Sequence, residues 1–346
     1  MNKENALYKE NALYQQDLRN IVSMPGIETL HGKTILITGA TGMVGTHLID
    51  ALMLLGDVKV YAVGRDKNRA MDRLGSYYDS PLFTFVEQDV CNKFPSDIKP
   101  DIIIPLASNT HPLAYSQYPV ETMLINIKGA EHALNLAVET GATVLYPSTV
   151  EVYGNAIGED TFSEDYTGKL NLSTSRSCYT ESKRSAEAMC QSFIAEKGAK
   201  VKIVRLSRLF GPTMLMTDSK ASSQFIKKAL AHKDIILKSE GNQLFSYTYI
   251  TDAVRAMLHV LIYGEVGTAY NISCESCDVR LKEFAGLCAQ YNGKDVIFEL
   301  PSETERKGFS VAQKAILDNS RLRSIGWTPL YNMKEALWRT LDIIAS

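Results

Sequence analysis

The sequence lacks the features that mark membrane, secreted and nucleic-acid-binding proteins. No apolar run approaches the length of a membrane-spanning helix, and the polar residues 1–20 contain no hydrophobic core of a signal peptide. The 37 basic residues are balanced by 39 acidic ones, so the charge gives no support to nucleic-acid binding. We therefore expect a cytoplasmic protein that binds neither membranes nor nucleic acid.

Cysteine is also scarce and shows no organised pattern. The six cysteines follow no disulfide framework, and Cys274 and Cys277 form one CxxC pair without the second pair of ligands that a structural zinc site needs. We expect reduced thiols and no metal site.

The composition is that of an ordinary globular protein, and 346 residues suffice for one large domain or two modest ones. Residues 1–30 stand apart because the sequence KENALY occurs twice, at 3–8 and at 9–14. We expect one or two helical turns, packed on the body of the protein or on a neighbouring subunit, and we assign them no chemistry. The apolar stripe that supports this expectation consists of Leu7, Tyr8, Leu13, Tyr14, Leu18 and Ile21.

A glycine-rich turn joins an apolar strand at 33–38 to an amphipathic helix that ends near residue 55. In a dinucleotide site, Gly39 would permit the tight turn, Gly42 would let the backbone approach the pyrophosphate, and Gly45 would let the helix pack on the strand. A structural glycine loop in another α/β protein is the alternative. The pattern predicts a cofactor site formed by Gly39, Thr41, Gly42, Met43, Val44 and Gly45.

The second strand, at 58–63, ends at Gly64 and Arg65, where an NAD enzyme usually carries an acidic residue for the ribose. Because Arg65 could pair with a 2′-phosphate, we expect NAD or NADP with a preference for NADP; a solvated arginine is the alternative. Strands at 83–86 and 101–106 and a helix at about 120–140 supply the remaining predicted cofactor contacts. These are Asp89, Val90, Leu106, Ala107, Ser108 and Asn126.

Further strands at 143–146 and 201–206 continue the alternation of strands and helices, which predicts an α/β protein with a Rossmann-type, doubly wound parallel sheet. A smaller C-terminal α/β substrate lobe follows. After the regular alternation ends, we also expect a strand at 247–251, with Asp252 capping the next helix. The predicted divisions are an N-terminal helical extension at 1–30, a dinucleotide-binding domain at 31–206 plus 246–272, and a substrate lobe at 207–245 plus 273–346.

Tyr179 and Lys183 are four residues apart, which places both side chains on one face of a helix. An ammonium beside a phenol stabilises the phenolate and lowers its pKa, so the tyrosine could exchange a proton with a substrate hydroxyl near neutral pH. The spacing alone is common on helix surfaces. The glycine turn makes a catalytic and cofactor-binding pair the better interpretation.

Together the motifs resemble the extended short-chain dehydrogenase/reductase family of nucleotide-sugar epimerases, dehydratases and decarboxylases. The resemblance covers about residues 33–330 and, within the family, is strongest to UDP-glucuronate decarboxylases. Val150 stands where dTDP-glucose 4,6-dehydratases carry an aspartate, which counts against that class. The motifs lie at 38–45, 147–154, 179–183, 209–212, 249–257 and 317–327, and the decarboxylase-like residues at 106–126, 164–171 and 176–184.

The resemblance implies the remaining site residues. Thr149 would hydrogen-bond the reacting oxygen, and Glu151 would act as acid or base beside it. Arg176 would bind a substrate carboxylate or phosphate. Two positions depart from the family: Phe245 replaces an arginine that binds the diphosphate, and Arg208 replaces an asparagine and could supply the lost charge. The predicted substrate contacts are Ser108, Thr149, Glu151, Arg176, Arg208 and Phe245.

These residues imply transient oxidation of a nucleotide-sugar at C4 by Tyr179 and Lys183, with UDP-glucuronate decarboxylation favoured. Epimerisation and dehydration stay open. An NADP-dependent ketosugar or carbonyl reductase, and a non-catalytic dinucleotide-binding module, are the alternatives. A homodimer is what the resemblance implies.

Overall fold

The structure is a computed structural model that describes residues 7–110, 112–154, 161–299 and 314–346. The start of the first KENALY unit therefore lies outside the described residues.

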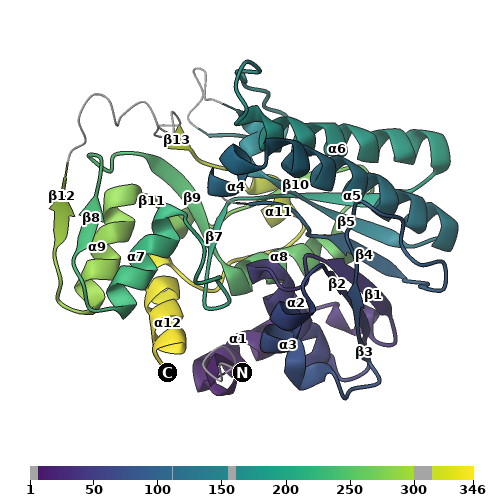
Figure 1. Cartoon of the computed structure of the whole chain (residues 1–346), viewed down its shortest axis with the longest axis horizontal. Coiled ribbons are helices and arrows are strands. Elements are labelled where there is room, and N and C mark those ends of the chain that lie inside the picture. The colour runs from purple at the N-terminus through teal and green to yellow at the C-terminus, as the bar shows by residue number, and fades with distance from the viewer. Residues whose placement is uncertain (1–6, 111, 155–160, 300–313) are drawn as a thin grey trace.

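A seven-stranded parallel sheet forms the centre of the molecule, in the order β10-β6-β5-β4-β1-β2-β3 (Figure 1). The order reverses between β1 and β4, as in a Rossmann-type fold, and the crevice at this reversal is where such sheets bind ligands. The predicted fold class is confirmed. The strands are β1 (Thr34–Thr38), β2 (Lys59–Gly64), β3 (Phe83–Glu87), β4 (Ile102–Pro105), β5 (Thr143–Thr149), β6 (Lys200–Leu206) and β10 (Ala269–Ile272).

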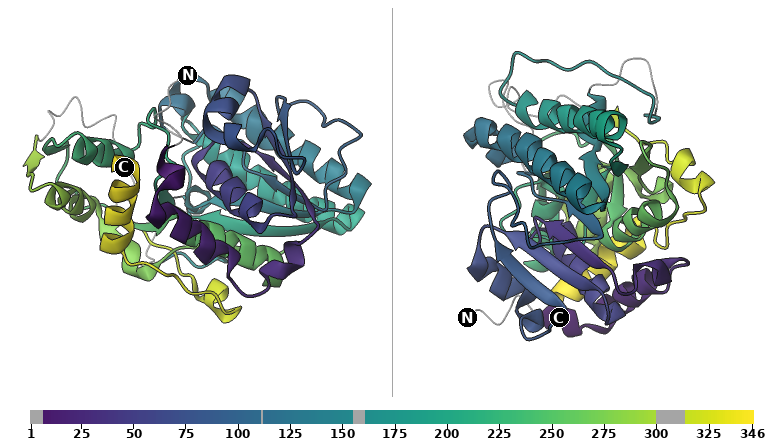
Figure 2. Two further views of the ribbon diagram at one scale, coloured as in Figure 1. Left: turned by 90° about the horizontal axis from the view of Figure 1, so that it is seen from below. Right: turned by 90° about the vertical axis from the view of Figure 1, so that its right-hand side faces the viewer.

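Helices cover both faces of this sheet (Figures 1 and 2). Side chains alternate between the faces of a strand. In β1, Leu36 joins the apolar layer under α5 and α6, whereas Ile35 and Ile37 join the layer under α2 and α8. The helices of this part are α2 (Met43–Leu55), α3 (Lys67–Leu74), α4 (Pro112–Gln117), α5 (Pro119–Thr140), α6 (Ser177–Lys197) and α8 (Ile250–Tyr263).

Two smaller sheets lie beyond the large one. In the first, β9 pairs with β7, β11 and β13, and in the second β12 pairs with β8. The boundary expected at residue 246 falls inside β9. The strands and helices are β7 (Arg208–Phe210), β8 (Ile235–Leu237), β9 (Leu244–Tyr249), β11 (Asp278–Arg280), β12 (Val296–Phe298), β13 (Lys314–Ala315), α7 (Ala221–Leu230), α9 (Leu281–Tyr291), α11 (Ser320–Ser324) and α12 (Met333–Ala345).

The expectation that Asp252 caps helix α8 is wrong. Tyr249 is the N-cap residue, and Asp252 lies inside the first turn. Its buried carboxylate accepts hydrogen bonds from the backbone N–H groups of Leu330 and Tyr331 at 2.9 and 3.3 Å. A tertiary contact with the C-terminal segment therefore replaces the local cap.

The N-terminal extension packs on the body of its own chain. The 3-10 turn η2 (Leu7–Glu10) leads into α1 (Ala12–Val22), which lies against α2, α8 and α12 (Figures 1 and 2). At three turns, α1 is longer than expected. Asp17 on α1 is fully buried and accepts hydrogen bonds from Tyr249, Tyr331 and Arg339.

No helix in the described part of the chain is long and apolar enough to cross a membrane.

Candidate active site

The glycine-rich turn fits the predicted dinucleotide site. Gly39 has a φ of 63°, and a Cβ there would lie 2.8 Å from the backbone N of Ala107 on the next strand end. A Cβ on Gly45 would lie 2.5 Å from the carbonyl oxygen of Gly39. Both glycines are therefore required for close packing, whereas a Cβ on Gly42 would meet only the Gly39 carbonyl oxygen, at 3.2 Å. Gly42 thus leaves room for a ligand above the turn.

The N-terminus of α2 is suited to an anion. Gly42 is its N-cap residue, no side chain caps the helix, and its first turn contains no acidic residue. The first N–H groups of a helix have no partner within the helix and carry partial positive charge. Thr41, Met43 and Val44 surround this end and are all partly exposed. The residues present therefore fit the pyrophosphate of a dinucleotide.

On the far side of β1, Arg65 follows β2 and already has a partner. Its Nη1 donates a hydrogen bond of 2.8 Å to Oε1 of Glu121, in the first turn of α5, and lies 3.8 Å from Oδ2 of Asp89. The hydrogen bond with Glu121 is the main cause that raises the pKa of Arg65. Val90, the neighbour of Asp89, is buried, and its carbonyl oxygen contacts His132. Glu121 was not among the site residues predicted from the sequence.

One of the predicted residues at the end of β4, Ala107, lines a small cavity. The backbone N of Ala107 donates to Thr38 Oγ1 at 3.0 Å, and Leu106 and Ser108 flank it, both partly exposed. The cavity, of about 10 Å³, is lined by Ala107, Asn126 and Lys183 among others, and it is large enough for about one water molecule. Asn126 Nδ2 donates to Ser182 on α6 at 2.9 Å, and its Oδ1 has no partner among the described residues.

The structure brings Thr149, Tyr179, Glu151 and Arg176 together. Thr149 ends β5, and its side chain hydrogen-bonds the buried phenol of Tyr179. Glu151 lies on the 3-10 turn η5 (Val150–Tyr153), and its Oε2 is 4.0 Å from Nη2 of Arg176 at the start of α6. A phenol, a hydroxyl, a carboxylate and a guanidinium are thus available at one site.

The pKa of Tyr179 is raised, not lowered. Burial is the main cause and Glu151 adds to it, while the hydrogen bond from Thr149 opposes the rise. Lys183 donates its Nζ hydrogen bond to the carbonyl oxygen of Pro147 at 2.9 Å, and burial lowers the pKa of its ammonium to about 8. The sequence placed both side chains on one helix face, but it could not show that the protein interior disfavours charge on each of them.

Tyr115 on α4 was not assigned a role from the sequence, yet it belongs to the site. Its ring stacks on that of Tyr179, with centroids 4.8 Å apart. Burial raises its pKa, and Tyr179 and Glu151 add to the rise. The only sequence signal was its place in the decarboxylase-like pattern after β4.

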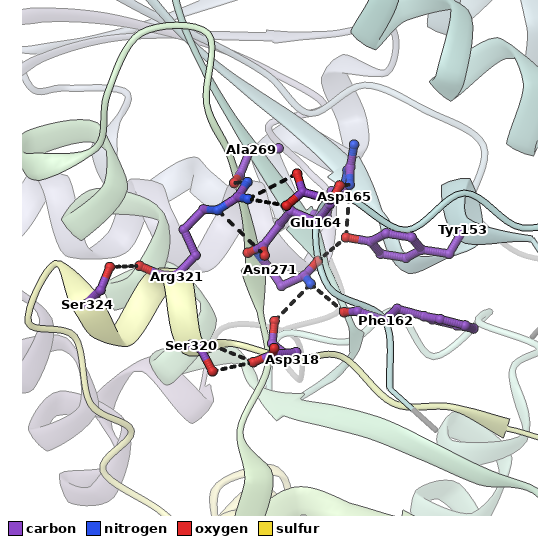
Figure 3. Close-up of polar contacts among 11 residues, drawn as sticks. Tyr153, Phe162, Glu164, Asp165, Ala269, Asn271, Asp318, Ser320, Arg321 and Ser324 are labelled. Carbon is purple, nitrogen blue, oxygen red and sulfur yellow. Dashed lines mark hydrogen bonds and ion pairs between the residues drawn. The ribbon is translucent and has the colours of Figure 1, made fainter. Parts of the chain in front are cut away.

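A polar network contacts Tyr153, Phe162 and Glu164, which lie between β5 and α6 (Figure 3). Glu164 accepts a hydrogen bond of 2.8 Å from the backbone N of Asn271 and lies 3.8 Å from Nε of Arg321. The Asn271 side chain contacts Tyr153 at 2.6 Å and the carbonyl of Phe162 at 2.9 Å. Because Tyr153 is two residues from Glu151, the network helps to position η5.

The two departures from the family pattern lie in contact with each other. The guanidinium of Arg208 is 3.6 Å from the centre of the Phe245 ring. Arg208 therefore stacks on Phe245, the residue that stands in place of the family's diphosphate-binding arginine. Its buried Nη1 has no partner among the described residues. Arg208 lies two residues beyond β6, whose Leu206 is paired with Thr149. The unpaired Nη1 donor of Arg208 therefore lies one strand away from Thr149, one of the predicted catalytic residues.

Sequence comparisons identify a family and relatives of the chain. The model of the NAD dependent epimerase/dehydratase family matches residues 35–273. The chain is 31% identical over 317 residues to UDP-glucuronic acid decarboxylase 1 of Xenopus tropicalis, covering 89% of this chain and 71% of that protein. It is 30% identical over 308 residues to UDP-glucuronic acid decarboxylase 6 of Arabidopsis thaliana, covering 88% and 86%.

Solved structures share the fold. UDP-glucose 4-epimerase of Thermotoga maritima, with UDP-glucose, matches with a TM-score of 0.76 and 21% identity over 90% of this chain and 98% of that one. UDP-glucuronic acid 4-epimerase of Bacillus cereus, in complex with UDP-glucuronic acid and NAD, matches with a TM-score of 0.74 and 21% identity over the same shares. From its family match and its curated relatives, the chain belongs to the NAD dependent epimerase/dehydratase family.

Proposed function

We propose that this protein is an NAD-dependent nucleotide-sugar decarboxylase that acts on UDP-glucuronate. The observation that carries the proposal is the joint placement of Thr149, Tyr179, Glu151 and Arg176. The relatives of 30–31% identity are UDP-glucuronic acid decarboxylases, which supports this substrate over the others used in the family.

The glycine turn, Lys183, Asn126 and the β4 end are the groups that would hold the cofactor, which supplies a hydride acceptor and donor when bound. Tyr179 would take the proton of the C4 hydroxyl as a phenolate, with Thr149 fixing that oxygen. Because burial raises the pKa of this phenol, the positive charge of an oxidised nicotinamide would be needed beside it to stabilise the phenolate. Oxidation at C4 makes the carboxylate on C5 a leaving group. The bond between C5 and the carboxylate then breaks, carbon dioxide departs, and the electron pair is delocalised onto the C4 carbonyl.

Arg176 and Glu151 would bind the substrate carboxylate and protonate C5, respectively. Arg176 pairs with the substrate carboxylate, because a guanidinium matches a carboxylate with two parallel hydrogen bonds. This pairing draws Arg176 away from Glu151. The Glu151 carboxylate would then take a proton from solvent and deliver it to C5. The side chain of Arg176 is about half exposed, at 53%, which leaves it free to turn toward a ligand.

Arg208 would contact the diphosphate of the nucleotide. Its stack on Phe245 holds the guanidinium plane, and its unpaired Nη1 offers a donor to an anion. Ser108 would face the sugar from the end of β4. The substrate lobe would consist of residues 207–245 and 273–346, set against the dinucleotide-binding domain.

We also propose that the enzyme is a cytoplasmic homodimer. Several apolar side chains on α5 are exposed and would be covered by a second copy: Val120, Met123, Leu124 and Val138.

A turnover screen by mass spectrometry tests the function. Purified protein with NAD would meet UDP-glucuronate and a panel of UDP-, dTDP-, GDP- and CDP-sugars, with Tyr179→Phe as control. We expect loss of carbon dioxide from UDP-glucuronate, a decrease of 10²-fold or more in Tyr179→Phe, and no loss of NAD binding. Loss of water would show that the enzyme is a dehydratase, and an isomeric product would show that it is an epimerase; either result would overturn decarboxylation.

An NADP-dependent ketosugar or carbonyl reductase is the second candidate. The observation that favours it is Phe245, an apolar residue at the position where the family binds the diphosphate. It predicts oxidation of NADPH by carbonyl compounds without a nucleotide and no release of carbon dioxide from UDP-glucuronate.

A further inference from the structure

Two side chains at strand ends and one at the start of a helix meet beside the part of the cofactor site predicted to hold the ribose. Arg65 follows β2, Asp89 follows β3, and Glu121 lies in the first turn of α5, the second helix after β4. Arg65 Nη1 is 2.8 Å from Glu121 Oε1 and 3.8 Å from Asp89 Oδ2. The Arg65–Glu121 contact joins residues 56 apart in the sequence.

From these contacts we propose that the Arg65–Glu121 ion pair selects NAD against NADP, with Glu121 as the specificity-determining residue. Arg65 alone would favour a 2′-phosphate. Paired with Glu121, its Nη1 already donates to a carboxylate, and the opposite charge weakens the attraction of the guanidinium for a phosphate. The proposal rests on the dinucleotide site and is independent of the sugar substrate.

The charge balance explains the direction of the selectivity. A 2′-phosphate carries nearly two negative charges at neutral pH. To bind it, Arg65 would have to leave Glu121, and the carboxylates of Glu121 and Asp89 would then both lie near the phosphate. Like charges at such distances repel, and the bound phosphate would also lose solvent. The ribose 2′-hydroxyl of NAD imposes neither penalty and can donate a hydrogen bond to a carboxylate.

Other charges nearby do not change this balance. Arg69 pairs with Asp66 at 3.9 Å, so its charge is matched on its own helix. Lys128 and Arg65 both act to lower the pKa of Cys91, whereas Asp89 acts to raise it, so a further positive and a further negative charge lie near this thiol. Arg65 itself lies within 4 Å of two carboxylates, those of Glu121 and Asp89.

Isothermal titration calorimetry of the full chain tests the proposal without any turnover. The dissociation constants of NAD and NADP would be measured for the wild type, Glu121→Gln, Arg65→Gln and the double variant. Glu139→Gln is the matched control, because it removes an exposed carboxylate from the last turn of the same helix. The wild type should bind NAD more tightly than NADP.

Glu121→Gln should bind NADP about tenfold more tightly, a gain of about 1.4 kcal/mol, while NAD affinity stays within about twofold. Arg65→Gln in the same background should abolish the gain, and added salt should reduce it. A wild type that binds NADP more tightly than NAD would overturn the proposal. The same holds if the ratio of the NADP and NAD dissociation constants is equal in Glu121→Gln and in the Glu139→Gln control. Neither result depends on whether UDP-glucuronate is decarboxylated, so a failure here is separable from a failure of the proposed function.

Discussion

The rings of Tyr115 and Tyr179 stack with centroids 4.8 Å apart and planes 18° from parallel. Tyr115 comes from α4 and Tyr179 from α6, so the contact fixes the phenol of Tyr179 from outside its own helix. An aromatic pair contributes about 0.5–1.5 kcal/mol beyond the area that it buries. We therefore interpret Tyr115 as a positioning residue for Tyr179.

Tyr115→Leu should lower kcat up to about tenfold, because that range of energy corresponds to at most a factor of this size. Tyr115→Phe keeps the stacked ring and should retain most of the activity. KM for the nucleotide-sugar should change little in either variant. Steady-state kinetics with both variants checks this, and equal losses in Phe and Leu would show that the hydroxyl, not the ring, is what matters.

Glu151→Gln tests the proton transfer at C5. The amide keeps the size of the side chain and loses its ability to carry a proton, so kcat should fall by about 10²–10⁴-fold, with NAD affinity unchanged. Glu181→Gln is a matched control, since Glu181 lies on α6 and pairs with Arg184 at 3.7 Å. Product formation by mass spectrometry and NAD titration measure both quantities. A Glu151→Gln rate equal to that of the control would exclude Glu151 from catalysis.

Local patterns predicted much of this molecule. The turn from Gly39 to Gly45 and the four-residue interval between Tyr179 and Lys183 depend on neighbouring residues, and their positions on strand, turn and helix follow from periodicity. The same logic failed for Asp252, because its carboxylate accepts hydrogen bonds from residues 78 and 79 positions away.

Contacts between distant parts of the chain could not be predicted from the sequence for the same reason. The stack of Tyr115 on Tyr179 and the ion pair of Arg65 with Glu121 join segments that only the packing of the sheet brings together. Neither pair has a spacing that signals contact. A sequence does not show which groups are removed from solvent. Lys183 was therefore expected to lower the pKa of Tyr179, and the effect of burial on the pKa of both groups was missed.

His47 on α2 should make stability depend on pH. Burial lowers its pKa to about 3, below the usual value of about 6.5 for an unfolded chain. The folded protein therefore binds this proton less readily than the unfolded chain. The contribution is fully present above pH 6.5 and is lost progressively as the pH falls toward 3. Its Nε2 lies 3.2 Å from Thr251 Oγ1.

His47→Gln can keep a hydrogen bond to Thr251 but does not titrate. The free energy of unfolding of the wild type minus that of the variant should fall by about 1.4 kcal/mol per pH unit between pH 6 and pH 4. Urea denaturation of both proteins at several pH values measures it. The raised pKa values of Asp252 and Asp278, both about 6, act in the opposite direction and cancel in the difference. A difference independent of pH would contradict the prediction.

Tyr8 and Tyr14 offer a matched pair for testing how the N-terminal extension is held. Their rings meet edge to face at 5.0 Å. The Tyr14 hydroxyl donates to Oδ2 of buried Asp50 at 2.5 Å, and Asp50 Oδ1 accepts from Lys9 and Tyr77 at 2.6 and 2.9 Å. The buried Tyr8 hydroxyl has no partner among the described residues.

Tyr14→Phe should lower the free energy of unfolding by about 1.5–3 kcal/mol, because it removes a hydrogen bond to a charged and buried acceptor. Tyr8→Phe should be neutral or slightly stabilising, since it removes a buried hydroxyl that makes no hydrogen bond and leaves the ring contact intact. Denaturant unfolding of the two variants beside the wild type separates these effects. Equal shifts in both would mean that ring packing, and not the Asp50 hydrogen bond, holds α1 on the body. A large shift in Tyr14→Phe alone would make Asp50 the point at which the extension is attached to α2, the helix whose N-terminus faces the predicted pyrophosphate.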